Sequence, residues 1–74
     1  MFRIGDVIQF TENHKWAGAF GFISKVRPSS EDIKYLIGVP MPDQGIAYIF
    51  SYESKNEFEK IGEAILMPVS YEED

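Results

Sequence analysis

The sequence predicts an all-β fold of five short strands closed into one small barrel, with a short helical turn before the last strand. Short runs rich in aromatic and β-branched residues alternate with clusters of glycine, proline and small polar residues, which are typical of strands and turns. The chain has 74 residues and no cysteine, so a single compact core must stabilise it without disulfides.

The first half of the chain predicts two strands that flank a loop. Residues 6–11 alternate so that Ile8 and Phe10 share one face. A polar and aromatic loop over 11–17 follows, and a second strand is expected at 19–27. The spacing of Gly18 and Gly21 predicts a tight turn with one glycine in the left-handed region.

The middle of the chain predicts a second pair of strands. Residues 28–32 have the composition of a turn, and residues 33–39 form the third expected strand. Within it, Tyr35, Ile37 and Val39 share one face, and Gly38 marks a bulge or a close approach of another backbone. Residues 40–45 read as a hairpin connection in which the prolines end the pairing, because proline has no N–H.

The fourth strand is expected at 46–51, and the periodicity changes after it. Ser54 and Glu57 have the spacing of a capping box, which predicts one or two helical turns over 55–60. A fifth strand is expected at 64–67, where Pro68 ends it. The predicted domain therefore covers residues 1–68, and an acidic tail covers 69–74.

Glycines at fixed spacing carry a resemblance to a known family. The strand that begins Gly5-Asp6 leads through a turn-rich segment to Gly18-x-x-Gly21-x-Ile23-x-x-Val26, and this pattern resembles the KOW motif of SH3-like barrels. The resemblance covers roughly residues 5–26. It implies a five-stranded SH3-like barrel whose loops and edges contact RNA or a protein partner. In size and acidity the chain also resembles small accessory or inhibitor proteins of phages and prophages.

The charge of the chain limits the classes of partner. The net charge is −5 and the isoelectric point is about 4.7, which disfavours a polyanionic partner. Most acids lie after residue 27, where we interpret them as ordinary solubility charge rather than as mimicry of DNA. No apolar run spans a bilayer and the first residues do not resemble a signal peptide, so we expect a cytoplasmic protein without a membrane partner.

No residue pattern predicts catalysis, a metal site or a cofactor. His14 is the only histidine, and its spacing from Ser24 or Ser51 does not suggest a catalytic triad. With Glu12 or Asp6 it does not form a zinc set either. The remaining carboxylates that could suggest acid–base chemistry are expected to form a solvated helix face: Glu53, Glu57, Glu59 and Glu63.

We therefore predict a non-enzymatic module that binds a protein partner, of unspecified oligomeric state. Its expected binding residues lie in the first loop and beside it: Glu12, His14, Lys15 and Trp16, with Phe20 and Tyr35 if these are exposed. Trp16 is either a binding residue or a lid on the core. The alternative is a nucleic-acid-binding domain that uses a basic strip: Arg3, Lys15, Lys25 and Arg27.

Overall fold

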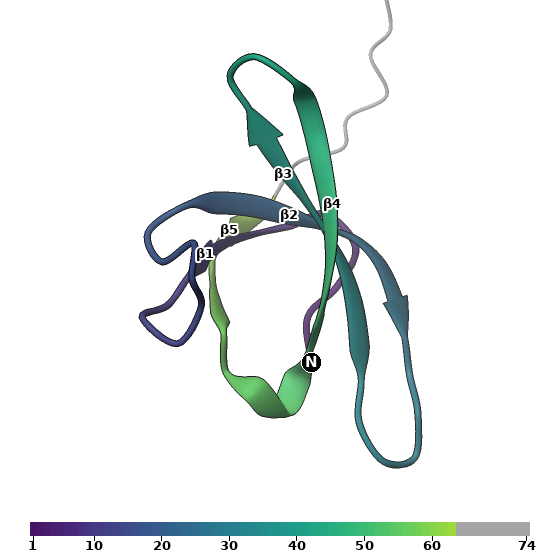
Figure 1. The fold of residues 1–74 in the computed structure, drawn as a ribbon. Helices are drawn as coiled ribbons and strands as arrows, with labels where there is room; N and C mark the ends of the chain where they lie inside the picture. The colour runs from purple at the N-terminus through teal and green to yellow at the C-terminus, as the bar shows by residue number, and fades with distance from the viewer. Residues whose placement is uncertain (64–74) are drawn as a thin grey trace, which may run out of the picture.

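The computed structural model describes residues 1–63, which form one antiparallel sheet of five strands with a single 3-10 turn (Figure 1). In chain order the elements are β1 (Asp6–Phe10), β2 (Phe20–Arg27), β3 (Lys34–Met41), β4 (Gly45–Tyr52), η1 (Glu53–Lys55) and β5 (Phe58–Glu63). The strands lie in the order β4-β3-β2-β1-β5. The all-β prediction is confirmed. Within this range β4 and β5 do not pair with each other, so the sheet is not closed.

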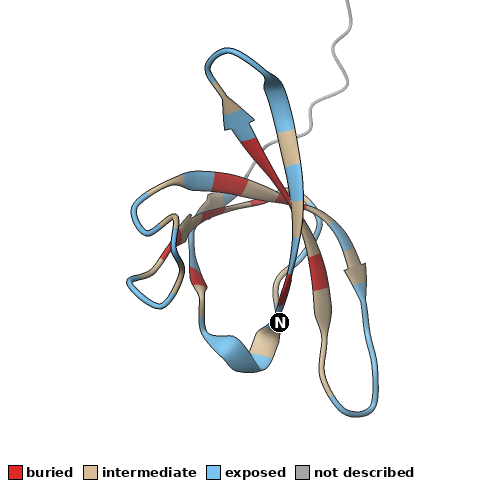
Figure 2. Cartoon of the chain, in the orientation of Figure 1, coloured by how far each residue is buried: buried red, intermediate tan, exposed pale blue. Residues whose placement is uncertain are grey.

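The core lies on the concave side of the curved sheet. The residues that the sequence predicted to share one face of β1 and one face of β3 point into it. Ile8 and Phe10 of β1 are buried, as are Tyr35, Ile37 and Val39 of β3. Figure 2 colours buried residues red, and these red segments are distributed over several strands of the sheet. Because side chains of a strand alternate between the two faces, the residues between them point away from the core.

Two glycines allow β2 and β3 to approach closely. A Cβ atom on Gly21 would lie 2.8 Å from the carbonyl oxygen of Gly38, closer than such atoms come in proteins. A Cβ on Gly38 would in turn collide with the ring of Phe22, which covers this glycine. At Gly38 a side-chain ring, not another backbone, occupies the space that a Cβ would need. Gly18 has a φ of +90°, which confirms the left-handed glycine before β2.

The prediction that pairing ends at Pro40 is wrong on one side of β3. The ladder between β3 and β4 continues through Pro40 and Met41 to Gly45. The amide of Glu53 donates to the carbonyl of Ile33 at 2.9 Å. In an antiparallel pair every second residue forms such bonds, so the odd-numbered residues of β3 direct their N–H and C=O groups toward β4. The nitrogen of Pro40 therefore faces β2, and the pairing of β2 with β3 ends at Phe22 and Gly38.

The helix predicted over 55–60 is also wrong. The helical turn covers Glu53–Lys55, and Asn56 ends it with a left-handed φ of 53°. The residues of the expected capping box bond elsewhere: the Ser54 hydroxyl donates to Asp32, and Glu57 accepts from Ser51.

The chain then forms β5, because Phe58 is buried in the core opposite Phe10 of β1. A hydrophobic contact distant in sequence thus outweighs the local helical pattern. The strand expected at 64–67, the domain end at 68 and the tail at 69–74 lie outside the described residues.

The strand β4 ends the sheet on one side. Within the described residues it pairs only with β3, and none of its residues is charged. Ile46, Tyr48 and Phe50 are exposed on its outward face. These three residues lie opposite the even-numbered residues of β3, which form no hydrogen bonds toward β4. Their main-chain N–H and C=O groups therefore point away from β3, outward from the edge of the sheet.

We predict that Gly21→Ala destabilises the protein by about 1–3 kcal/mol, because the added methyl group meets the backbone of β3. Urea unfolding monitored by circular dichroism measures this change. Gly62→Ala is the matched control, since Gly62 also lies in a strand and a Cβ there meets no atom of residues 1–63 within 4 Å. Equal stability of the two variants would contradict the close approach of β2 and β3.

Candidate functional site

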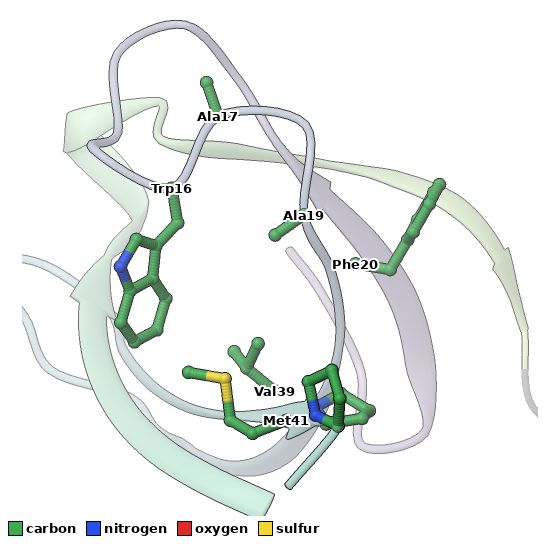
Figure 3. A pocket seen from close by; sticks show the side chains of 8 residues that line it. Trp16, Ala17, Ala19, Phe20, Val39 and Met41 are labelled. Carbon is green, nitrogen blue, oxygen red and sulfur yellow. The ribbon is translucent and has the colours of Figure 1, made fainter.

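A largely apolar pocket of about 660 Å³ lies between the loop that connects β1 to β2 and the hairpin that connects β3 to β4. Figure 3 shows the Trp16 indole and the side chains of Val39 and Met41 pointing into the same space. Eight residues line this pocket: Trp16, Ala17, Ala19, Phe20, Val39, Pro40, Met41 and Pro42. None of the eight side chains titrates, so the pocket itself offers no general acid or base.

Trp16 serves both of the roles that the sequence left open. Its side chain is half-buried and packs against the core, with its ring edge-to-face with Phe10 at a centroid distance of 6.4 Å. The remainder of the indole forms a wall of the pocket. A tryptophan fixed in this way is a rigid apolar anchor, which loses little conformational freedom when a partner binds.

His14 organises the loop that carries Trp16. Its Nδ1 atom accepts a hydrogen bond from the Trp16 amide at 2.9 Å, and its ring lies on Phe10 at a centroid distance of 4.3 Å. These contacts fix the backbone just before the indole. His14 thus positions a pocket residue and does not line the pocket itself.

The other residues predicted for the binding face have different positions. Phe20 lines the pocket and is exposed, as expected. Glu12 and Lys15 are exposed in the same loop but do not line the pocket, although Lys15 lies 6.0 Å from the Trp16 ring. Tyr35 was predicted to bind only if it were exposed. It is fully buried, so it does not belong to the binding face.

The sequence analysis missed the half of the pocket that comes from the hairpin. Pro40, Met41 and Pro42 were interpreted only as a turn. A turn with three successive apolar residues at the surface is unusual, because connecting segments are mostly polar. This apolar turn was the one indication in the sequence that the hairpin contributes to a site.

A smaller apolar hollow of about 300 Å³ adjoins the pocket, and Phe20 and Pro40 line both. The second hollow continues over Val7, Gly21 and Phe22. The two hollows together form an elongated apolar surface with Phe20 between them.

The predicted basic strip is divided by the fold. Lys25 and Arg27 lie together on the outward face of β2, beside Lys34 of β3. Arg3 and Lys15 do not line this place. Lys34 was absent from the prediction because strand pairing, not sequence proximity, brings it to β2.

Within residues 1–63, four acidic residues contact groups in other parts of the fold. Glu53 accepts a hydrogen bond from Tyr35, and Glu57 accepts one from Ser51. Glu63 and the buried Asp6 both contact Lys60, and the hydrogen bond with Glu63 raises the pKa of Lys60. Within residues 1–63 no group of three His, Asp or Glu side chains is placed to hold a metal ion.

No helix in residues 1–63 is long and apolar enough to cross a membrane.

The buried phenol of Tyr35 predicts a loss of stability at high pH. Burial and the hydrogen bond to Glu53 raise the pKa of Tyr35 from 10.0 to about 12. The native state favours the protonated phenol over the phenolate. The contribution of this phenol to the free energy of unfolding is therefore complete below pH 10 and is lost as the pH rises toward 12. Urea unfolding between pH 9 and pH 12 should show a decline that is smaller in Tyr35→Phe.

The matched control is Tyr48→Phe, which removes a phenol from an exposed site and should keep the decline of the wild type. A Tyr35→Phe protein that loses stability as steeply as the wild type would contradict this assignment.

Comparison of the chain with protein-family models, with curated proteins and with solved structures finds no match.

Proposed function

We propose that this protein is a non-enzymatic binding module that engages a protein partner through the apolar pocket beside Trp16. The observation that carries the proposal is the lining: all eight residues are apolar, and they come from two separate parts of a 74-residue chain. One part is the loop after β1 with the first residue of β2, and the other is the end of β3 with the first residue after it. Exposed apolar surface costs free energy in water, so a hollowed apolar surface on a small domain marks an interaction site.

The chemistry of the pocket favours binding over catalysis. The lining has no nucleophile, acid or base, and the only histidine is held by the backbone of its own loop. Sites for small polar molecules place several polar groups around an apolar centre. Here the indole N–H of Trp16 is the only polar side-chain group among the lining residues.

The shape of the surface favours an extended partner segment. The pocket and the adjoining hollow share Phe20 and Pro40, so two apolar side chains of one partner segment can occupy them on either side of Phe20. Met41 lines the larger pocket, and its flexible side chain can adapt to different shapes of apolar ligand. Trp16 supplies the rigid anchor.

We propose further that the described sheet belongs to an SH3-like barrel. Five short antiparallel strands and a helical turn directly before β5 support this assignment. In this arrangement the pocket lies at one end of the sheet, and its exposed lining residue Phe20 can be substituted without opening the core.

The test begins with capture of a partner by the tagged protein, with and without nuclease, followed by calorimetry with the purified partner. Phe20→Ala should weaken binding by at least tenfold, as is typical when an anchor of an interface is truncated. Met41→Ala should weaken it as well. Trp16→Ala should also abolish binding, but it is informative only if unfolding experiments show that this variant remains folded.

The matched control is Phe50→Ala, since Phe50 is 62% exposed and Phe20 is 55% exposed, and Phe50 lies outside the pocket. This variant should bind the partner like the wild type. If Phe50→Ala abolishes binding and Phe20→Ala does not, the pocket is not the partner site.

A further inference from the structure

The acidic and basic residues of this chain are segregated in a way that the net charge conceals. The chain has 12 acidic residues, and none lies in β2, β3 or β4. The same three adjacent strands carry Lys25, Arg27 and Lys34. An acidic protein thus has a sheet region whose only formal charges are positive.

Strand pairing brings these cations beside exposed aromatic rings. Lys25 of β2 pairs with Leu36 of β3, which pairs with Phe50 of β4. In the next row Arg27 pairs with Lys34. Paired residues point to the same side of a sheet, so the cations and the aromatic rings share the outward face, opposite the core.

The cations and Phe50 surround a hollow of about 230 Å³. The ammonium group of Lys34 lies 4.2 Å from the centre of the Phe50 ring, within reach of a cation–π interaction. Tyr48, two residues before Phe50 on the same face, is 53% exposed. Residues two apart along a strand have Cα atoms about 7 Å apart, so Tyr48 follows Phe50 on the outward face of β4, one row beyond the hollow.

Nearby acids do not neutralise this face. Within residues 1–63 no carboxylate lies within 4.0 Å of Lys25, Arg27 or Lys34. Of the acids closest in sequence, Asp32 accepts from Ser54 and Glu53 accepts from Tyr35, while Glu31 is exposed in the turn before β3. The hydrogen bond from Ser54 lowers the pKa of Asp32, which keeps this carboxylate ionised in its own contact.

We propose that the outward face of β2, β3 and β4 binds single-stranded nucleic acid. The phosphate groups are held by Lys25, Arg27 and Lys34, and unpaired bases stack on Phe50 and Tyr48. Each nucleotide brings an anion and a flat ring together, which matches the pairing of cations with aromatic rings on this face. An acidic peptide would engage the cations but leave the aromatic rings exposed, and a duplex would keep its bases within the stack.

The net charge of −5 does not exclude this site. Charges farther apart than about 8–10 Å are largely screened at physiological ionic strength, so the local cations dominate the contact with phosphate. The overall negative charge lowers the affinity for nucleic acid at low salt, but it does not change which face of the protein the nucleic acid contacts.

The experiment uses fluorescence anisotropy with labelled oligothymidylate and oligouridylate, and with a duplex of equal length. Three phosphate contacts predict a slope of about −2 for the logarithm of the association constant against the logarithm of the salt concentration. Affinity should therefore fall about 20-fold between about 50 and 200 mM salt. Lys25→Ala combined with Lys34→Ala should reduce the magnitude of the slope by about 1.4.

The matched control combines Lys15→Ala with Lys55→Ala, which changes the net charge equally at two exposed lysines outside this face. It should leave the slope unchanged. Phe50→Ala should weaken binding at least about fivefold, as the loss of one stacked base does. Since Phe50 is exposed, this variant should fold normally.

Three results would overturn the proposal: absence of binding at the lowest salt, equal losses in the two double variants, or tighter binding of an oligoglutamate peptide than of the oligonucleotides. The last result would identify an acidic protein segment as the occupant. Phe20→Ala should not change oligonucleotide affinity, and the Lys25 and Lys34 double variant should still capture the protein partner, so the two sites can fail independently.

Discussion

The buried side chain of Tyr35 is the contact on which the rest of this structure depends. It lies in the middle strand of the β2–β3–β4 half of the sheet, and its ring packs edge-to-face on Phe2 and Phe58 at centroid distances of 5.4 and 5.5 Å. Its hydroxyl accepts from the Phe2 amide and donates to Glu53. One residue therefore joins β3, the first residues of the chain, the 3-10 turn and β5. Side-chain contacts thus draw the two ends of the sheet around one core, although β4 and β5 do not pair in the part of the chain that the structure describes.

The elements that the sequence predicted well are those with simple periodicity. Alternation in β1 and β3 correctly grouped Ile8 with Phe10, and Tyr35 with Ile37 and Val39, because a period of two places alternate residues on one face. The structure shows that both groups face the core. The segment after Tyr52 was misread because its spacing satisfies a helix locally. Only contacts distant in sequence, such as Phe58 against Phe10, select a strand there.

The candidate sites were predictable only in part, for the same reason. Trp16 and Phe20 were found because they belong to one loop and its adjoining strand. Met41 was missed because the fold, not the sequence, brings the hairpin to that loop. Lys34 was missed in the same way, since it joins Arg27 only through the register of β2 with β3. Residues that act together from separate strands leave no linear pattern in one sequence.

The outer edge of β4 can promote association between molecules, and the net negative charge of the chain opposes this association. Within residues 1–63, β4 is an uncharged edge strand with exposed aromatic residues, and such a strand is a template for pairing with another molecule. Repulsion between whole molecules, set by the net charge of −5, must then keep such edges apart. This repulsion vanishes as the pH approaches the isoelectric point of about 4.7. Mild acidification thus removes the barrier to association while the edge itself remains unchanged.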